Sequence, residues 1–420
     1  MNILWITNIT FPEAIVRLRG EGDLKSSGGW MLGAAETLVQ HEGVDLSVAS
    51  LSCDVEKLTY IKGEQISYYI FPYGNGNLKY NKEYEKYWKI INEKIRPDVV
   101  HIHGTEYSHG LAYVNACGAD NVVVSIQGLV SAVGDYYCYG LSLLDIVSNI
   151  TLLDLVRGPV LYEKKLMKKR GELEKSLLKK VNHVIGRTNW DKSRVWGINK
   201  DAKYHFCNEI LRNEFYEGPY WQYDKCKKHT IFLSQASYPI KGLHQLLKAM
   251  PLILKDYPDT KIRISGHDIT KSLQIKGIIP SVSGYGKYIR KLIHALKLGE
   301  NIEFVGCLDA IGMKQEYLNC NVFVCPSSIE NSPNSLGEAQ ILGTPCVCSY
   351  VGGIPNMMQG DEAHLYRFEE YSMLANIICD VFRSRNFPSH MREVARKRHD
   401  RYTNTNTLFE IYSEIAKKSV

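Results

Sequence analysis

The chain has 420 residues and a mass of 47.8 kDa, a length that predicts two domains. Hydrophobic residues make up 45% of the chain and charged residues 23%, which excludes a disordered, collagen-like or coiled-coil protein. The net charge of +6 is modest, and no apolar run approaches the roughly 18 residues that a membrane-spanning helix needs.

The N-terminal sequence MNILWITNITFPEA lacks the basic start and the small-residue cleavage site of a signal peptide, so we interpret it as a first buried strand. The 11 cysteines are scattered and form no Cys-x-x-Cys motif. The closest pair, Cys346 and Cys348, alternates within an apolar stretch as small core residues do. This usage predicts free thiols in a reducing cytoplasm.

Short apolar runs alternate with amphipathic stretches through the first half of the chain. Strands are predicted at residues 2–7, 45–51, 65–71, 98–103 and 121–126, and helical spacing occurs at 30–41, 84–95 and 107–117. This alternation is typical of a mostly parallel sheet covered by helices.

The alternation stops at residues 214–228, a polar and aromatic stretch that we interpret as a linker, and then resumes. The second half predicts strands at 230–234, 260–265, 301–305, 321–326 and 345–350, with helices at 242–255, 285–297 and 336–342. Two α/β domains follow from this pattern. Parallel sheets bind ligands beyond the carboxyl ends of their strands, so we expect the site in a cleft between the domains.

Several common motifs are absent. The chain has no Walker A sequence, no complete Gly-x-Gly-x-x-Gly and no His-Glu-x-x-His, which disfavours P-loop NTPases, dinucleotide dehydrogenases and zincins. No Asp-x-Asp occurs to hold a divalent metal on a nucleotide diphosphate. A metal site from His101, His103, Glu106 and His109 is also conceivable, but we interpret the first two as a core-facing pair on one strand and reject a metal.

The most informative segment is residues 326–353, PSSIENSPNSLGEAQILGTPCVCSYVGG. Glu330 follows a strand end, and the amides of 334–337 lie near a helix N-terminus, which is a favourable anion site. Glu338 lies about one turn into that helix, where it could reach ligand hydroxyl groups. The alternative is that both glutamates are solvated helix-end carboxylates favoured by the helix dipole.

This segment resembles glycosyltransferase family 4, whose retaining GT-B enzymes carry two glutamates separated by seven residues, as Glu330 and Glu338 are. The family's Glu-Ala-x-x-x-Gly-x-Pro-Val stretch follows at 338–346, with Cys346 in place of valine and with a glycine pair at 352–353. Further matches are the glycine pair Gly28-Gly29, the strand sequence at 97–104, Lys241-Gly242 and a C-terminal helix at 404–416.

The resemblance implies an α/β GT-B fold of two Rossmann-like domains whose parallel sheets face an inter-domain cleft. Residues 1–213 would form the acceptor-binding domain and residues 229–395 the nucleotide-sugar-binding domain, joined by the linker 214–228. Residues 396–420 would form a C-terminal helix that crosses back to the first domain.

The activity implied by the resemblance is hexosyltransferase-like: sugar transfer from a nucleotide-diphosphate-sugar, expected to be a UDP-sugar, with retained anomeric configuration and with neither a metal nor a cofactor. Lys241 would neutralise the diphosphate, and Glu338 would hold the ribose hydroxyls. Gly28 and Gly29 would allow the backbone to approach the donor phosphate, and Gln127 would contact a sugar hydroxyl. Sugar and phosphate would be oriented by Glu330 and by the amides of Asn334, Ser335 and Leu336.

Two positions depart from the family pattern. The family's arginine ahead of Lys-Gly is Ala236 here, so Lys241 would act with helix-end amides alone, or Arg187 or Arg263 would compensate. A histidine that many members carry after the strand at 121–126 is replaced by Gln127, which can hydrogen-bond but cannot titrate.

Residues 151–200 contain 13 Lys and Arg against 5 Asp and Glu, so this segment carries the whole net positive charge of the chain. An apolar stretch from Leu141 to Leu152 could form one amphipathic helix beside Lys164, Lys165, Lys168, Lys169 and Arg170. Residues 141–180 therefore suit an anionic membrane surface, which places the protein at the inner face of the cell membrane. The alternative is a solvated helix face. Nucleic acid is not expected, because aromatic residues are not interleaved with the basic ones.

The leading hypothesis is a glycosyltransferase acting on a glycan acceptor, lipid-linked if the membrane interpretation holds, in bacterial surface polysaccharide synthesis such as capsule or O-antigen. The alternatives are a GT-B transferase making a soluble glycoside, and a catalytically weakened nucleotide-sugar-binding protein. Ala236 and Gln127 favour the last of these.

Overall fold

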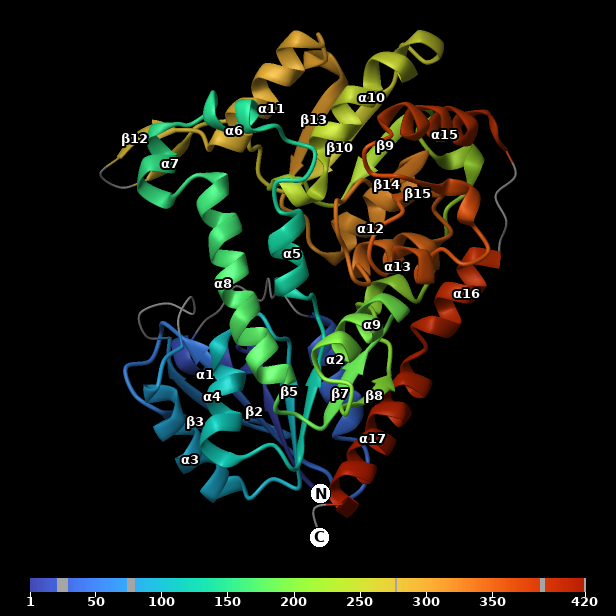
Figure 1. The fold of residues 1–420 in the computed structure, drawn as a ribbon. Coiled ribbons are helices and arrows are strands. Elements are labelled where there is room, and N and C mark those ends of the chain that lie inside the picture. The colour runs from blue at the N-terminus through green and yellow to red at the C-terminus, as the bar shows by residue number, and fades with distance from the viewer. Residues whose placement is uncertain (21–28, 74–79, 276–277, 386–389, 419–420) are drawn as a thin grey trace. The chain divides into compact units, whose positions relative to one another are not determined.

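The computed structural model describes residues 1–20, 29–73, 80–275, 278–385 and 390–418 (Figure 1). The chain forms two compact units. Unit 1 comprises Met1–Val133, Met167–Arg212 and His399–Val420, and unit 2 comprises Gly134–Leu166 and Asn213–Arg398. The chain passes from unit 1 to unit 2 within one helix, α5 (Val130–Tyr136), and returns within another, α8 (Val160–Leu178).

An eight-stranded sheet forms the centre of unit 1, in the order β3-β4-β2-β1-β5-β6-β7-β8. Neighbouring strands are parallel except β3 with β4. The strands are β1 (Asn2–Ile6), β2 (Asp45–Ser52), β3 (Thr59–Lys62), β4 (Ile66–Pro72), β5 (Val99–His103), β6 (Val122–Ser125), β7 (His183–Gly186) and β8 (Lys203–Phe206). The other helices of this unit are α1 (Pro12–Arg19), α2 (Gly29–Leu38), α3 (Glu83–Ile95), α4 (Ser108–Cys117), α9 (Asn189–Ile198) and α17 (Arg401–Lys418).

Both faces of this sheet are buried. Alternate residues of β1 enter different cores, Leu4 and Ile6 on one face and Ile3 and Trp5 on the other. Parallel strands covered by helices on both sides are continuously apolar, which explains why runs such as 121–126 predict strands without any polar alternation.

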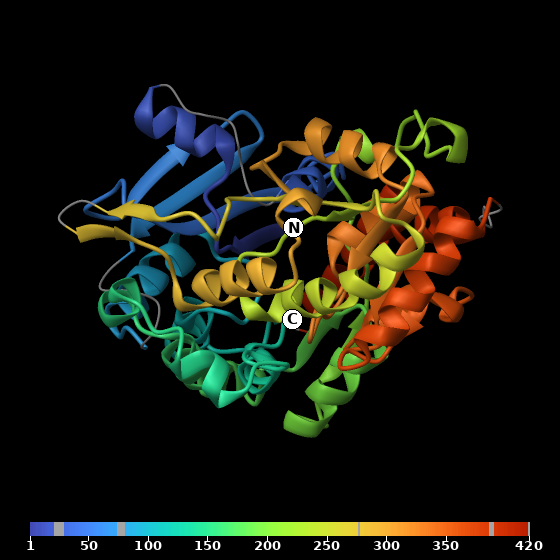
Figure 2. The same cartoon turned by 90° about the horizontal axis from the view of Figure 1, so that it is seen from above.

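Unit 2 contains a six-stranded parallel sheet in the order β13-β10-β9-β14-β15-β16. Its strands are β9 (Thr230–Leu233), β10 (Lys261–Ser265), β13 (Ile302–Gly306), β14 (Val322–Cys325), β15 (Cys346–Ser349) and β16 (Leu365–Tyr366). Two further strands, β11 (Leu273–Ile275) and β12 (Ile278–Ser281), pair with each other apart from that sheet (Figure 2). The helices are α6 (Leu143–Val147), α7 (Leu152–Arg157), α10 (Leu243–Asp256), α11 (Gly284–Ala295), α12 (Ala310–Asn319), α13 (Asn334–Leu342), α14 (Ile354–Met357), α15 (Tyr371–Arg383) and α16 (His390–Arg398).

The strands predicted from the sequence and most of the predicted helices are present, with bounds shifted by three residues or fewer. The C-terminal helix expected at 396–420 is α17, which begins only at Arg401, because residues 396–398 belong to α16. The strands not predicted are short, and β3, β8 and β16 lie at sheet edges. Several helices were also not predicted, among them α8, α9, α12 and α15. A single amphipathic helix from Leu141 to Leu152 is wrong, because α6 and α7 are separate helices. Each begins with a capping box, from Ser142 to Asp145 and from Thr151 to Asp154.

The compact units are not contiguous in sequence, whereas the domains expected from the sequence are. Residues 134–166 lie in unit 2, although they fall within the expected first domain 1–213. Residues 214–228, expected as a linker, also lie in unit 2, where Phe215 is fully buried and the indole nitrogen of Trp221 donates to the carbonyl of Cys320 at 2.8 Å. Periodicity identifies an element, but it does not reveal which sheet that element covers.

Candidate active site

Lys241 and Glu330, 89 residues apart in the sequence, form an ion pair in unit 2, with 2.6 Å between Nζ and Oε1. Lys241 ends a short 3-10 helix (Pro239–Lys241) that follows β9, and Glu330 lies in the loop after β14. The hydroxyl of Ser327 donates to the same carboxylate oxygen at 2.8 Å. The side chains of the lysine and the glutamate are 20% and 14% exposed. The fold therefore brings together Lys241, which the family resemblance assigns to neutralising the diphosphate, and Glu330, which it assigns to orienting the sugar and phosphate.

The strand order of the sheet explains this meeting, because β9 and β14 are neighbours and their following loops touch. Gly242 has a left-handed backbone, with φ of +70°, and a Cβ added there would lie 1.7 Å from the carbonyl oxygen of Pro326. The amide of Ser328 donates to the carbonyl of Ile240 at 2.7 Å. Only glycine allows so close an approach of the two loops.

Replacing Gly242 by alanine is therefore expected to destabilise the fold by about 2–4 kcal/mol, because a left-handed alanine and a steric overlap with backbone each cost about 1–2 kcal/mol or more. Urea denaturation measures this change. Gly299→Ala is the matched control, since Gly299 has no atom within 4 Å of the added Cβ and no positive φ. Equal stability of the two variants would contradict the close contact between the loops.

Electrostatics keep Lys241 charged. Burial alone would lower the pKa of Lys241, but the adjacent Glu330 carboxylate outweighs burial and raises this pKa above its ordinary value. The site therefore holds a permanent ammonium group whose partner is one carboxylate. A bound anion with more charge, such as a diphosphate, would compete with Glu330 for that ammonium.

Glu338 lies in the first turns of α13, which begins at Asn334. Its side chain is 4% exposed, and the hydroxyl of Tyr317 donates to Oε2 at 3.4 Å. The interpretation of Glu330 and Glu338 as solvated helix-end carboxylates is therefore wrong, because one is paired and the other is buried. Of the amides predicted to bind an anion, that of Leu336 donates to the carbonyl of Pro333 within the helix start at 3.0 Å.

The remaining predicted site residues belong to unit 1. Gln127 follows β6, and its amide nitrogen is buried without a hydrogen-bond partner among the described residues. An unpaired buried donor is costly and is available to a ligand oxygen. Gly29 begins α2, whereas Gly28 lies outside the described residues.

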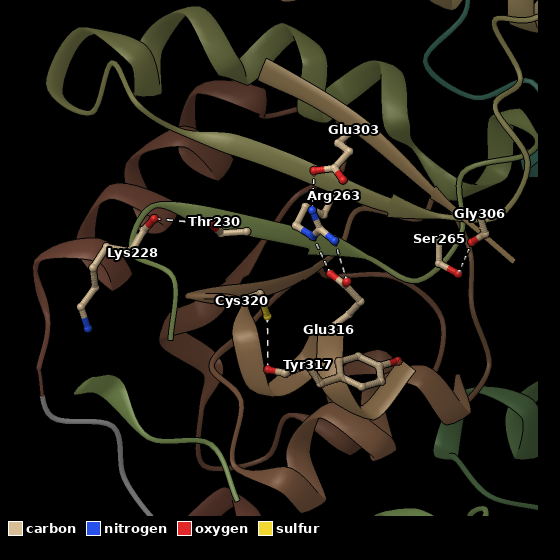
Figure 3. Close-up of polar contacts among 9 residues, drawn as sticks. All are labelled: Lys228, Thr230, Arg263, Ser265, Glu303, Gly306, Glu316, Tyr317 and Cys320. Atoms are coloured by element: carbon tan, nitrogen blue, oxygen red, sulfur yellow. Dashed lines mark hydrogen bonds and ion pairs between the residues drawn. The ribbon is translucent and has the colours of Figure 1, made fainter. Parts of the chain in front are cut away.

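Neither arginine considered as a substitute at the Ala236 position is free. Arg263 on β10 makes two hydrogen bonds to Glu316, at 2.7 and 2.8 Å, and also pairs with Glu303 (Figure 3). The hydrogen bonds with Glu316 raise the pKa of Arg263 above its ordinary value. Arg187 pairs with Glu209 and donates to the carbonyl of Ile126 at 2.7 Å. A diphosphate would have to displace a carboxylate from either one.

Sequence reasoning missed Ser327 and Tyr317, which contact the two glutamates. Tyr317 lies on α12, which was not predicted. A signal was present, because β13 and β14 are parallel strands of one sheet and such strands require a crossover between them, usually a helix. Met313 and Tyr317 then share the buried face of that helix at a spacing of four residues.

His101 and His103 are buried in unit 1 with their ring centroids 3.7 Å apart, as expected for a core-facing pair. Burial lowers the pKa of His103 to about 3, so this imidazole is neutral at pH 7. Within the described parts of the chain, no three His, Cys, Asp or Glu side chains are grouped so that they could hold a metal ion.

Residues 221–398 match the family model described as glycosyl transferases group 1. Among curated relatives, an uncharacterized glycosyltransferase of Methanocaldococcus jannaschii is 27% identical over 32% of this chain and 30% of its own length. YtcC of Bacillus subtilis is 25% identical over 74% of this chain and 71% of its own length. The phosphatidyl-myo-inositol mannosyltransferase of Mycobacterium leprae is 24% identical, and the match spans 46% of this chain and 48% of that relative.

Two solved structures have the same fold over nearly the whole chain. Sucrose-phosphate synthase from Thermosynechococcus elongatus superposes with a TM-score of 0.66 at 17% identity, covering 98% of both chains. The Anabaena protein HepE, solved in complex with UDP and glucose, superposes with a TM-score of 0.63 at 15% identity, covering 98% of this chain and 99% of that one.

Proposed function

Because residues 221–398 belong to the glycosyl transferases group 1 family and the chain has the GT-B fold, we propose that this protein is a retaining glycosyltransferase that uses a nucleotide-diphosphate-sugar. The observation that carries the proposal is the Lys241–Glu330 pair at the carboxyl ends of two adjacent parallel strands. Ligands bind at that edge of a parallel sheet. The donor proposed is a UDP-sugar, a choice supported by the UDP and glucose bound to HepE.

In the proposed reaction, the bond between the anomeric carbon and the β-phosphate oxygen breaks. The acceptor hydroxyl oxygen bonds to the same face of that carbon, and its proton passes to the departing phosphate oxygen. Negative charge grows on the diphosphate as the bond breaks, so the permanently charged Lys241 stabilises the transition state more than the bound donor. This scheme needs no nucleophile from the protein.

The other site residues receive binding roles in this proposal. Glu330, once its ammonium partner turns to the diphosphate, orients the sugar, and Glu338 accepts hydrogen bonds from the ribose. Phosphate contacts are assigned to the amides of Asn334 and Ser335 in the first turn of α13 and to Gly28 and Gly29. The amide of Leu336 would contact phosphate only by giving up its hydrogen bond to the carbonyl of Pro333. Gln127 donates to a sugar hydroxyl with its unpaired amide nitrogen.

The proposed acceptor is a glycan hydroxyl, lipid-linked, in bacterial surface polysaccharide synthesis at the inner face of the cell membrane. The similarity to a phosphatidyl-myo-inositol mannosyltransferase, whose name specifies a lipid, supports this choice. In the described part of the chain, no helix has the length and apolar character needed to cross a bilayer. A soluble glycoside is the second candidate product, favoured by the match to sucrose-phosphate synthase over 98% of the chain.

Thermal unfolding in the presence of UDP, GDP or ADP tests the donor class. At a concentration about 100 times Kd, the matching nucleotide is expected to stabilise the folded protein by about 2.7 kcal/mol. Transfer from radiolabelled UDP-sugars then tests catalysis, and NMR of the product's anomeric proton tests retention. No shift with any of the three nucleotides would contradict the proposal, and a UDP shift without hydrolysis or transfer would favour a sugar-nucleotide-binding protein.

A further inference from the structure

A cluster of large aliphatic side chains in unit 2 faces solvent. In the described structure, ten of the twenty exposed large hydrophobic side chains lie between Tyr139 and Tyr162. Six of them form what we call the aliphatic face of α6 and α7: Leu143 (71% exposed), Leu144 (77%), Val147 (58%), Leu152 (56%), Leu155 (75%) and Val156 (63%). Exposed apolar patches of this kind mark interaction sites.

The opposite side of α6 and α7 is anchored in unit 2. Ile146 and Leu153 are 8% and 2% exposed, and both point away from the aliphatic face. The carboxylate of the buried Asp154 accepts from the amide of Gly284 at 3.0 Å, and Lys287 donates to the carbonyl of Ile150 at 3.3 Å. Both partners lie at or in α11, beside which Figure 1 draws α6. The aliphatic side chains are thus presented outward by a fixed scaffold.

The residue pattern of these helices is the reverse of an ordinary surface helix, which exposes its polar side chains. Asp145 and Asp154 are the only carboxylates between residues 139 and 162, and each is used in a capping box. Capping turns these carboxylates to their own backbone amides, while the leucines and valines point to solvent. The two carboxylates are satisfied within the unit, whereas the exposed leucines and valines are not covered by it.

We infer that the aliphatic face of α6 and α7 inserts into the outer part of an anionic lipid bilayer. Charge complementarity along α8 identifies a bilayer as the partner. From Leu161, helix geometry places Lys164 and Lys165 about 5–6 Å along the axis and Lys168 and Lys169 about 11–12 Å along it. An amphipathic element buries its apolar face about 5–10 Å into the headgroup boundary, so the lysines nearest Leu161, which is itself 38% exposed, lie within reach of lipid phosphates when Leu161 enters that boundary.

Two exposed tyrosines flank α6 and α7 in the sequence, Tyr139 before them and Tyr162 after them, each 46% exposed. Tyrosine is enriched at the interface between lipid and water because its ring is apolar and its hydroxyl is polar. Along the chain from α7 into α8, the exposed apolar side chains are followed by Tyr162 and then by Lys164 and Lys165, which is the order in which a bilayer changes from acyl chain to headgroup. A protein partner would not require that order.

This inference changes which residues drive the membrane attachment expected from the sequence. Arg170, one of the five cations of that stretch, donates to the carbonyl of Glu106 at 2.8 Å, and its guanidinium lies 4.7 Å from the centroid of the Tyr107 ring. It therefore supports unit 1. The aliphatic face supplies insertion and the lysines of α8 supply attraction, so a test must vary the two separately and leave Arg170 intact.

The experiment measures binding of the whole protein to vesicles of phosphatidylcholine with or without 30 mol% phosphatidylglycerol, by co-sedimentation at low and high salt. Wild-type protein is expected to bind the anionic vesicles, and Leu144→Gln/Leu155→Gln is expected to lower the partition coefficient at least tenfold, or about 1.4 kcal/mol. Ile311→Gln/Met373→Gln is the matched control, since those side chains are 62% and 47% exposed elsewhere in unit 2.

Replacing Lys164, Lys165, Lys168 and Lys169 by glutamine should instead remove the salt dependence of binding. Amide hydrogen exchange should slow in peptides covering 141–157 when vesicles are added. Failure of wild-type protein to bind anionic vesicles at low salt would overturn the inference, and so would equal binding by the leucine variant. A dimer in lipid-free solution that the leucine variant abolishes would assign the face to a second copy of the chain instead. No nucleotide enters these measurements, so their outcome is independent of the proposed activity.

Discussion

Replacing Lys241 by methionine is expected to lower kcat by about 100- to 1,000-fold, with a smaller effect on KM. The ammonium offsets charge that grows on the diphosphate only as the glycosidic bond breaks, and removing one such donor costs this much in other enzymes. Steady-state transfer from a UDP-sugar measures the change. Lys255→Met, at an exposed position of α10, is the control and should leave kcat unchanged.

The single variant leaves Glu330 without its cation, so a disturbed site could also lower the rate. The double variant Lys241→Met/Glu330→Gln removes that unpaired charge and separates the two causes. If charge stabilisation is the role of Lys241, the double variant stays at least as slow as the single one. Recovery of activity in the double variant would show that Lys241 only holds Glu330 in place.

The pKa of Lys241 also predicts the pH dependence. Glu330 raises this pKa above the value of an unfolded lysine, so the ion pair contributes its full stability below the unfolded pKa and loses it only as pH rises through the folded one. The ammonium therefore stays charged at every neutral or mildly alkaline pH. Any fall in kcat between pH 6 and 9 must come from another group and should persist in the Lys241→Met variant.

The sequence contained most of the information needed for the elements of the fold. Strands such as β1 and β14 are buried on both faces, so residues 3–6 and 322–325 form uninterrupted apolar runs that few other structures require. The edge strand β8, with the sequence KYHF, lacks such a run because its residues are partly exposed. Burial produces the pattern, and strands that are less buried leave a weaker one.

The meeting of Lys241 with Glu330 could not be predicted in the same way. Each residue was found through its own motif, but their 2.6 Å contact depends on β9 lying next to β14, although four other strands of unit 2 and about 90 residues separate them in sequence. Strand order is fixed by how helices pack over the whole sheet, which no local pattern contains. Likewise, the engagement of Arg263 by Glu316 follows from the position of α12.

The boundaries of α6 and α7 could have been predicted, because Ser142 with Asp145 and Thr151 with Asp154 both have the spacing of a capping box. The sequence left open whether this apolar stretch faces a membrane surface or the core. The exposure of its leucines, together with the anchoring of the opposite side by Asp154 and Gly284, shows that it faces outward.

Glu338→Gln is expected to raise the Kd for UDP by about tenfold to a hundredfold, since hydrogen bonds to a charged acceptor are worth about 1.5–3 kcal/mol. Glutamine keeps the size of the side chain at a position that is only 4% exposed, so the fold should persist. Isothermal titration calorimetry with UDP measures the change. Tyr317→Phe removes the hydroxyl that donates to Glu338, and it should weaken UDP binding only a few-fold because the carboxylate remains.

Inorganic diphosphate separates a ribose contact from a general loss of the site. Diphosphate lacks the ribose, so Glu338→Gln should leave its inhibition constant unchanged. Lys241→Met should raise that constant, because the variant lacks the ammonium that binds the diphosphate charge. Glu338→Gln would then lose affinity only for ligands that contain the ribose, whereas Lys241→Met would lose affinity for the diphosphate group itself. If Glu338→Gln weakens diphosphate as much as UDP, or if it lowers the melting temperature in the absence of ligand, the buried carboxylate supports the turn between β14 and α13 and does not contact the donor.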